Sequence, residues 1–254
     1  MLISKTIIIG ANSFLGKNII SKIGRAKTLK FSSTIKKDYI HYKIGDNIDD
    51  KINKKFKITK IIYLAWERRN IKKNNENINI YGIKKINKFA KRNNIPLYFT
   101  SSFSAILKKN NYGKVKFQCE KIVLKNKLNR IFRIAMITAE NGGLIYRIQN
   151  FFNKLPFFIM PGDGEFKIYT AKLNKVVNIL LKNYKNLKKI NYIYEKPSIK
   201  FNKLFITGNK IIINFPIWLI RFLLIITKFF NFSNSSFNYD GFLGLINNPK
   251  NVKK

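Results

Sequence analysis

Residues 6–16 read Thr-Ile-Ile-Ile-Gly-Ala-Asn-Ser-Phe-Leu-Gly, and this stretch decides the fold. Its first four residues are an apolar, mostly β-branched run that ends at Gly10, which is typical of a buried parallel strand. Helical spacing of apolar residues starts at Phe14, so a tight turn joins a strand to a helix. The first N–H groups of a helix lack partners and carry the positive end of its dipole, so the turn is a candidate phosphate site. The glycine spacing is Gly10…Ser13…Gly16, and the alternative is an ordinary strand–turn–helix with glycines for packing.

The amino-acid composition limits the class of protein and of site. The chain has 254 residues, of which 46% are hydrophobic, enough for one large domain or for a main domain with a small appendage. Its one cysteine, Cys119, excludes a disulfide framework and a cysteine metal site, and its one histidine, His41, excludes a cluster of several His ligands. No metal site is therefore predicted. The N-terminus lacks the features of a signal peptide, so we expect a cytoplasmic protein.

The charge balance is strongly basic. The chain has 50 Lys and Arg against 12 Asp and Glu, a formal net charge of +38 at pH 7. Such a charge suits nucleic-acid binding. The lysines, however, are spread over the whole length and accompany abundant Asn and Ile, so a solvated basic surface is favoured and a nucleic-acid partner is not expected. The charge still attracts anionic partners such as nucleotide phosphates or acidic lipid headgroups.

Strand-like and helix-like patterns alternate along the first half of the chain. The expected strands lie near 5–9, 27–31, 39–44, 60–65, 96–102 and 130–138, and the expected helices near 14–24, 77–93, 113–125 and 173–182. This alternation predicts right-handed βαβ units and a parallel sheet. Ligands of such sheets bind at the carboxyl ends of the strands, where Gly10, Ala65 and Ser102 gather.

Residues after the second and third strands bear on the choice of dinucleotide. A carboxylate after the second strand would accept hydrogen bonds from an adenosine ribose and favour NAD. Residues 32–34 read Ser-Ser-Thr instead, and Lys36 and Lys37 follow, so the sequence leans slightly to NADP. Asp46 follows the third strand and is either a contact for the adenine edge or a turn residue.

Tyr112-Gly113-Lys114-Val115-Lys116 is the second informative stretch. Tyr112 and Lys116 are four residues apart, so at a helix start they share one face. An ammonium beside a phenol favours the phenolate and lowers its pKa from about 10. Tyr112 then exchanges a proton with a substrate hydroxyl or carbonyl, and Ser102 hydrogen-bonds the same oxygen. The alternative is a half-buried tyrosine beside a surface lysine. The functional interpretation is favoured because both residues follow a strand that ends in hydroxyl groups.

In this order, these pieces resemble the extended short-chain dehydrogenase/reductases of the NAD-dependent epimerase/dehydratase family. The resemblance covers roughly the first 140 residues and is carried by residues 10–16, 45–46, 61–65, 79–82, 99–102 and 112–121. It implies an enzyme that moves a hydride between a nicotinamide and a sugar carbon, usually on a nucleotide-linked sugar. It also implies that Tyr112 is the acid/base, that Lys116 holds the nicotinamide ribose, that Ser102 orients the substrate and that Asn79 supports the site.

The resemblance also implies which residues hold NAD or NADP. They are Gly10, Asn12, Ser13, Phe14, Leu15, Gly16, Asp46, Leu64, Ala65, Tyr112 and Lys116. The sequence departs from the family pattern at three places. Ser13 stands where the family has glycine, residues 133–136 read Arg-Ile-Ala-Met in place of Arg-Pro-Gly, and the connection from Ser102 to Tyr112 is short.

The C-terminal part is less informative. Residues 155–164 resemble a family segment near the bound nucleotide, which makes Gly164 a candidate substrate residue, although a simple turn fits equally well. Residues 215–232 are strongly apolar, but Arg221 and Lys228 interrupt them, so they fall short of the roughly 20 clean residues of a spanning helix. A helix buried against the smaller domain is favoured over an interfacial helix at lipid headgroups. Residues 239–245 resemble the ending of relatives in cell-surface polysaccharide synthesis.

The sequence as a whole predicts a Rossmann-type, doubly wound α/β sheet. Residues 1–150 form the expected dinucleotide-binding domain with the catalytic Tyr and Lys, and residues 151–254 a small, mostly helical substrate domain that interleaves with it. The expected function is an NAD(P)-dependent epimerase, dehydratase or reductase for a nucleotide sugar, in polysaccharide synthesis, with a possible homodimer and a possible peripheral membrane contact. An inactive dinucleotide-binding scaffold and a nucleic-acid-binding relative of the same fold are the alternatives.

Overall fold

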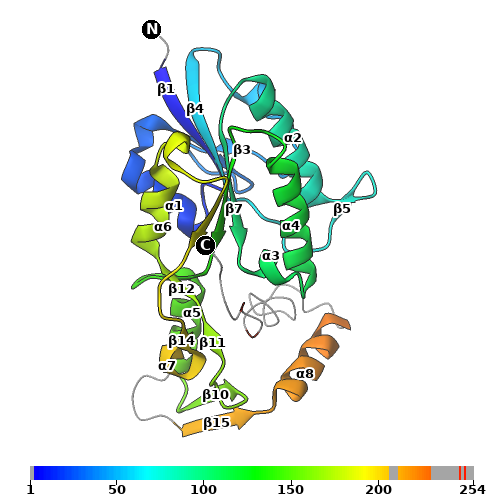
Figure 1. Ribbon diagram of the computed structural model, residues 1–254, viewed down its shortest axis with the longest axis vertical. Coiled ribbons are helices and arrows are strands. Elements are labelled where there is room, and N and C mark those ends of the chain that lie inside the picture. Colours follow the sequence, from blue (N-terminus) through cyan, green and yellow to red (C-terminus); the bar gives the residue numbers. More distant parts are fainter. Residues whose placement is uncertain (1–2, 206–210, 230–245, 247–248, 250–254) are drawn as a thin grey trace.

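A seven-stranded, fully parallel sheet forms the centre of the computed structural model, which describes residues 3–205, 211–229, 246 and 249 (Figure 1). Its order is β13-β8-β7-β4-β1-β2-β3. The strands are β1 (Ile3–Ile9), β2 (Thr28–Ser32), β3 (Ile40–His41), β4 (Phe56–Tyr63), β7 (Leu97–Ser102), β8 (Arg130–Ile134) and β13 (Ile190–Ile193). The chain builds outward from β1 first to one side and then to the other, which confirms the predicted doubly wound, Rossmann-type sheet.

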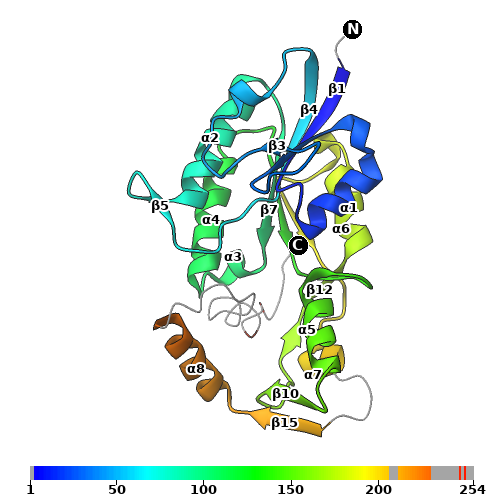
Figure 2. The ribbon, with the colours of Figure 1, turned by 180° about the vertical axis from the view of Figure 1, so that it is seen from behind.

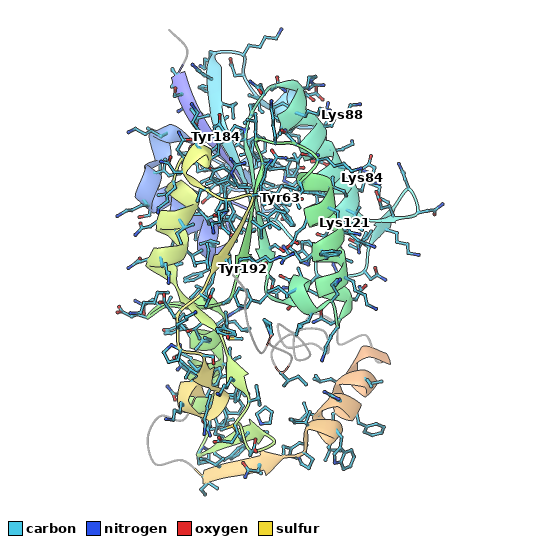
Figure 3. The ribbon with its side chains drawn as sticks, in the orientation of Figure 1. Tyr63, Lys84, Lys88, Lys121, Tyr184 and Tyr192 are labelled. Atoms are coloured by element: carbon cyan, nitrogen blue, oxygen red, sulfur yellow. The ribbon has the colours of Figure 1, made fainter. Side chains whose placement is uncertain are left out.

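Helices cover both faces of this sheet, as the two opposite views show (Figures 1 and 2). One pair of helices packs together on one face, a second pair packs together on the other, and a short helix packs against one helix of the second pair. The first pair is α1 (Phe14–Ile23) and α6 (Leu173–Leu181), the second is α2 (Ile78–Arg92) and α4 (Asn111–Val123), and the short helix, which packs against α4, is α3 (Ser104–Leu107). Exposed lysines 84 and 88 on α2 and 121 on α4 project away from the sheet, whereas Tyr63 lies inside it (Figure 3).

The core is divided by the sheet into two halves. Alternate side chains of a strand point to opposite faces, so Ile7 and Ile9 pack toward α2 and α4 while Ile8 and Ile62 pack toward α1 and α6. All four side chains are completely buried. Complete burial of an isoleucine stabilises the fold by about 1.5–3 kcal/mol. The uninterrupted apolar run of β1 therefore reflects a strand covered on both faces.

The predicted single strand at 130–138 is wrong in one respect, because the chain changes sheets at Ala135. β8 ends at Ile134, and β9 (Met136–Thr138) pairs in parallel with β12 (Thr170–Lys172). The Ala135 N–H still donates to Ile193 O of the main sheet at 3.0 Å, whereas the Met136 N–H donates to Tyr169 O at 3.2 Å. The strand thus leaves the main sheet at its carboxyl edge, beside the candidate site.

A smaller unit lies beyond this edge of the sheet (Figure 1). A separate cluster that includes Phe158, Met160, Phe201 and Phe205 forms its core. Within it, two strands pair in parallel and two pair antiparallel. Its elements are α5 (Gly143–Asn153), β10 (Phe157–Pro161), β11 (Lys167–Ile168), β14 (Ile199–Lys200), α7 (Phe201–Phe205) and β15 (Ile211–Phe215). Between β12 and β14 the chain returns to the large unit to form α6 and β13.

The expectation that the apolar segment 215–232 is buried is wrong for residues 217–225, whose exposure the structure describes. It forms α8 (Ile217–Phe229), which follows β15 and stands apart from α5 and α7 in both views (Figures 1 and 2). Trp218 is 69% exposed, and Phe222, Leu223 and Ile225 are exposed as well. No helix in the described part of the chain is both long and apolar enough to cross a membrane. The predicted element at 239–245 lies outside the described residues.

Candidate functional site

The turn between β1 and α1 is built by two glycines at close backbone contacts. Gly10 has a φ of +88°, and a Cβ on it would lie 2.8 Å from the Ala65 backbone nitrogen. A Cβ on Gly16 would lie 2.6 Å from the Gly10 carbonyl oxygen. Only glycine fits at such approaches. The start of α1 therefore lies directly against the carboxyl ends of β1 and β4.

Ser13 caps the first helix. Its Oγ accepts a hydrogen bond from the Gly16 N–H at 3.1 Å, and its φ of −68° is ordinary for any residue. A serine therefore replaces the family's glycine here without backbone strain. The N–H groups of Phe14 and Leu15, in the first turn, have no intrahelical acceptor. They remain suited to a phosphate group.

A cavity of about 690 Å³ opens above this turn. It is lined by Gly10, Asn12, Ser13, Leu64 and Ala65, which were predicted to hold a dinucleotide, and by residues 32–34 after β2. The Asn12 amide group bridges this edge, because its Nδ2 donates to Thr34 Oγ1 at 3.4 Å and its Oδ1 accepts from Lys36 Nζ at 3.3 Å. The cavity thus joins the glycine turn to the end of β2.

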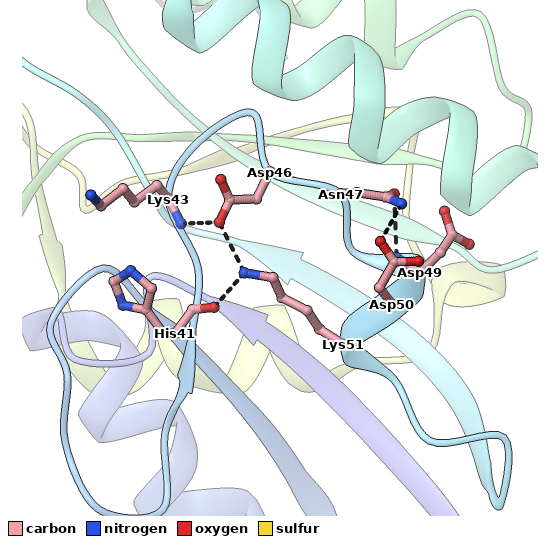
Figure 4. A network of polar contacts seen from close by, with 7 residues as sticks. All are labelled: His41, Lys43, Asp46, Asn47, Asp49, Asp50 and Lys51. Atoms are coloured by element: carbon pink, nitrogen blue, oxygen red, sulfur yellow. Dashed lines mark hydrogen bonds and ion pairs between the residues drawn. The ribbon is translucent and has the colours of Figure 1, made fainter.

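The Asp46 carboxylate holds its own loop (Figure 4). Its Oδ2 accepts hydrogen bonds from the Lys43 N–H and the Lys51 Nζ, both at 2.9 Å. Partial burial raises the pKa of Asp46, but these bonds outweigh it and leave the pKa below its usual value. Lys43 and Ile44 line the cavity and Asp46 does not. Its predicted contact with a cofactor stays a prediction.

A second cavity, of about 420 Å³, contains the predicted catalytic residues Ser102, Tyr112 and Lys116. The side chain of Tyr112 is hydrogen-bonded to that of Ser102. Lys116 is 4% exposed and its Nζ donates to the Thr100 carbonyl oxygen at 2.8 Å. Asn110 caps α4 by accepting from the Gly113 N–H at 2.8 Å. The cap starts the helix just before Tyr112, so the predicted four-residue spacing falls on one helical face.

The protonation behaviour of this pair differs from the prediction. Desolvation raises the pKa of Tyr112 to about 12, although the bond to Ser102 and the charge of Arg68 lower it. Desolvation also lowers the pKa of Lys116 to about 8. The expectation that Lys116 lowers the pKa of Tyr112 is wrong for this arrangement, because its Nζ lies 5.7 Å from the phenol ring centroid and donates to Thr100.

An irregular segment after β4 separates the two cavities. Leu64, Trp66, Glu67, Arg68 and Arg69 line both of them. The Trp66 ring lies against Lys116, whose Nζ is 3.9 Å from the indole centroid, and packs edge-on against Tyr112 at 5.3 Å between ring centroids. Sequence reasoning missed Trp66 and the residues after it. Their only signal was an indole and three charged residues directly after a buried strand.

A buried ion pair lies beneath the second cavity. Arg133 Nη2 donates to Glu120 Oε2 at 2.6 Å, and Arg133 Nε donates to Glu120 Oε1 at 3.0 Å. Ser101 Oγ donates to the same Oε1 at 2.5 Å, and Arg133 Nη1 donates to the Tyr192 hydroxyl at 2.8 Å. The network joins α4, β7, β8 and β13 and thereby fixes the helix that carries Tyr112.

The other predicted site residues have different surroundings. Phe14 packs against the positive-φ Gly142, where a Cβ would lie 2.6 Å from its ring. Leu15 lines the second cavity. Gly164 lies in the turn after β10, beside Met160 and outside both cavities, so its substrate role stays a prediction. Within the described ranges, no three His, Cys, Asp or Glu residues gather as metal ligands.

Comparison with known proteins identifies the fold. No protein-family model matches the sequence, and no curated protein does. Solved structures do match. A dTDP-glucose 4,6-dehydratase from Bacillus anthracis in complex with NAD has a TM-score of 0.69 at 14% identity, covering 84% of each chain. A UDP-N-acetylglucosamine 4-epimerase from Bacillus cereus matches with a TM-score of 0.62 and 18% sequence identity. The match covers 83% of this chain and 85% of the epimerase. An L-threonine dehydrogenase from Phytophthora infestans matches with a TM-score of 0.66 and 13% sequence identity. The match covers 84% of this chain and 85% of the dehydrogenase. The chain therefore shares the fold of NAD-dependent epimerases and dehydratases of the extended short-chain dehydrogenase/reductase type.

Proposed function

We propose that this chain is an NAD(P)-dependent epimerase, dehydratase or reductase that acts on a nucleotide-linked sugar. The observation that carries the proposal is that Ser102, Tyr112 and Lys116 line one cavity, which adjoins a second cavity above the glycine turn. Two of the similar structures are named for reactions of nucleotide sugars. The threonine dehydrogenase shares the fold as well, so the sugar is a proposal and not a consequence of the fold.

The cofactor fits the first cavity by its backbone chemistry. The pyrophosphate would rest on the N–H groups at the start of α1, where Gly10 and Gly16 leave room for close approach. The adenosine would lie near Asn12 and residues 32–34. Those three hydroxyl residues and the nearby Lys36 support NADP, because no carboxylate among them opposes a 2′-phosphate. The similar dehydratase structure holds NAD, so both dinucleotides are tested below.

A bound dinucleotide would supply a nicotinamide ring that can accept a hydride from a substrate carbon and return it. The side chains of the second cavity would transfer the proton of the sugar hydroxyl group. Tyr112 removes a proton from the sugar hydroxyl during oxidation and returns it during reduction. Ser102, already hydrogen-bonded to Tyr112, holds the same oxygen in line. The Lys116 ammonium, which lines the same cavity, would hold a ribose hydroxyl of the dinucleotide.

Incubation of the purified protein with UDP- and dTDP-sugars and either NAD⁺ or NADP⁺ tests this function. We expect a new or epimerised sugar nucleotide by mass spectrometry and NMR. The matched variant is Tyr112→Phe, which keeps the ring and removes the hydroxyl. It should lose turnover by about 10²–10⁴-fold while dinucleotide affinity stays within a few-fold. Equal turnover by both proteins would reject the catalytic assignment.

A dinucleotide-binding scaffold without turnover is the second candidate. The specific observation in its favour is that the pKa of Tyr112 is raised to about 12 while Lys116 is turned to Thr100 and Trp66. A scaffold binds NAD(P) with no change in any sugar nucleotide. Calorimetric binding combined with the product assay distinguishes it from the enzyme.

Three further parts of the proposal concern location and assembly. The enzyme would work in the cytoplasm, in cell-surface polysaccharide synthesis, where nucleotide sugars are consumed. The exposed apolar residues of α8 and β15 support a peripheral membrane contact. A homodimer would use α2 and α4, whose outer face carries exposed lysines 84, 88 and 121 (Figure 3).

A further inference from the structure

The two cavities of the site adjoin each other along one shared segment of the chain. The segment from Leu64 to Arg69 lines the cavity above α1 on one side and the cavity around Tyr112 on the other. A ligand with one end on the glycine turn and the other end at Tyr112 must pass this segment. The side chain that reaches farthest into the passage toward Lys116 is Trp66, because its ring covers the ammonium.

The indole takes up the free side of Lys116. The Lys116 Nζ donates to Thr100 O at 2.8 Å, and its other neighbours are the rings of Trp66 at 3.9 Å, Phe99 at 4.8 Å and Tyr112 at 5.7 Å. An ammonium over an indole face is the strongest common cation–π pair. No carboxylate shares a hydrogen bond with this ammonium in the described part of the chain. A ribose hydroxyl that approached the ammonium from this side would displace the indole, which lies 3.9 Å from Nζ.

The backbone on each side of Trp66 is fixed. The Ala65 N–H donates to Ile9 O at 3.1 Å, and the Glu67 N–H donates to Asn79 Oδ1 at 2.8 Å. Asn79 is buried and returns a bond from its Nδ2 to the Glu67 carbonyl oxygen at 2.9 Å. The Glu67 side chain is itself held by Arg69 through three hydrogen bonds, one from its backbone N–H and two from its guanidinium group. Any opening at this point is therefore a rotation of the Trp66 side chain and not a movement of the loop.

We propose that the Trp66 side chain is a gate between the two halves of the dinucleotide site, closed over Lys116 when no dinucleotide is bound and displaced when one binds. The inference rests on the proposed function, since it requires that a dinucleotide spans both cavities. In this proposal Trp66 affects the affinity for the whole dinucleotide but not the affinity for its adenosine half. ADP needs only the cavity above α1, so it does not compete with the indole for the space over Lys116.

Closure lowers the apparent affinity for NAD(P) because only the open fraction of molecules binds it. Trp66→Ala removes the gate, so we expect NAD⁺ or NADP⁺ to bind about three- to ten-fold more tightly than to the wild type by calorimetry. ADP affinity should be equal in both proteins. Trp66→Phe, which keeps a smaller ring over Lys116, should lie between them and shows whether the loss of the larger side chain disturbs folding.

Fluorescence gives a readout that does not depend on turnover. The chain has two tryptophans, so Trp218→Phe leaves Trp66 alone and Trp66→Phe leaves the exposed Trp218 as the matched control. Saturating NAD⁺ or NADP⁺ should shift Trp66 emission to longer wavelength and raise its acrylamide quenching constant about two-fold. Saturating ADP should do neither, and Trp218 should respond to none of these ligands.

The outcomes separate this proposal from the proposed function. If NAD(P) binds but the Trp66 signal stays constant, or if Trp66→Ala binds NAD(P) no more tightly than the wild type does, the gate is wrong and the function stands. If Trp66→Ala binds NAD(P) and the wild type does not, the gate is supported and the indole blocks binding completely in the wild type. If neither protein binds ADP or NAD(P), both proposals fail.

Discussion

Arg133 and Glu120 form a two-point ion pair beneath the candidate site, with Nη2–Oε2 at 2.6 Å and Nε–Oε1 at 3.0 Å. Glu120 is 1% exposed, and Ser101 donates a third hydrogen bond to it. Because Arg133 and Ser101 both donate hydrogen bonds to this carboxylate, its charge is compensated inside the protein. The pair ties the last turn of α4 to β8 and thereby helps to fix the helix that carries Tyr112.

Removing one partner of this pair should destabilise the protein strongly. Glu120→Gln leaves the Arg133 guanidinium buried without its countercharge, and we expect a loss of about 3–5 kcal/mol in the free energy of unfolding. Glu76→Gln is the matched control, because Glu76 pairs with the exposed Lys84 on the surface. It should cost less than about 1 kcal/mol. Urea unfolding measures the free energy of unfolding of both variants. Equal losses would show that the buried pair stabilises the protein no more than the surface pair does.

Ser13 should act as a helix cap and not only as a small residue in a glycine position. Ser13→Ala removes the acceptor of the Gly16 N–H and should cost about 1 kcal/mol of stability. Ser13→Gly, which restores the family pattern, should cost only a few tenths of a kcal/mol. Thermal unfolding of the two variants provides the comparison. If the Ser13→Ala variant were as stable as the wild type, the capping role of Ser13 would be contradicted.

The sequence was sufficient for the sheet and for the convergence of Ser102, Tyr112 and Lys116 on one cavity. The apolar run of β1 is a local property of a strand buried on both faces, and the spacing of Tyr112 and Lys116 is a local property of a helix. Ser102 and Ala65 could be placed at one edge because carboxyl ends of parallel strands meet there. Each of these inferences needs only periodicity and connectivity.

Other features depend on contacts that periodicity does not encode. The Trp66 ring lies over Lys116 because Asn79, twelve residues beyond Glu67, fixes an irregular segment. The raised pKa of Tyr112 follows from its burial among residues from several parts of the chain, which removes water from the hydroxyl group. The exposure of α8 follows from the direction in which β15 leaves the smaller unit. None of these contacts has a repeating pattern in the sequence.

Lys116 should make stability depend on pH in a defined window. Its pKa is lowered to about 8 from 10.5, so between these values the unfolded chain binds a proton that the folded chain does not. The stability contributed by this site therefore rises with pH from about 8 to 10.5 and is lowest below pH 8. Lys116→Met removes the titration. Its free energy of unfolding relative to wild type should fall by about 1–3 kcal/mol between pH 7 and pH 10.

Urea unfolding at four pH values from 7 to 10 measures this difference. Tyr112 and Cys119 titrate in both proteins, so their contributions largely cancel. Lys114→Met is the matched control, because it removes an exposed lysine from the same helix in place of the buried one. A constant difference between Lys116→Met and wild type would mean that Lys116 keeps its ordinary pKa.

A dimer through α2 and α4 should become tighter with salt. Lys84, Lys88 and Lys121 project from this face (Figure 3), so two copies brought together would repel each other. Raising the salt from about 0.05 M to 0.5 M shortens the screening length from roughly 14 to 4 Å and weakens this repulsion. Sedimentation velocity should show more dimer at the higher salt. Lys84→Gln/Lys88→Gln should shift the equilibrium toward dimer at low salt, and a dimer fraction that falls with salt would contradict this interface.

The exposed apolar side chains of α8 should bind an anionic bilayer. Trp66→Phe leaves Trp218 as the only tryptophan, so its emission reports on α8 alone. Vesicles with anionic lipid should shift this emission to shorter wavelength, because the indole moves from water into the headgroup boundary while the basic surface is attracted to the lipid charge. Phe222→Asn/Leu223→Asn, which makes two exposed apolar positions polar, should weaken vesicle co-sedimentation at least about ten-fold. Lys84→Gln/Lys88→Gln lowers the charge elsewhere and should weaken it by less. If the α8 variant binds vesicles as well as its parent does, the retention comes from net charge alone.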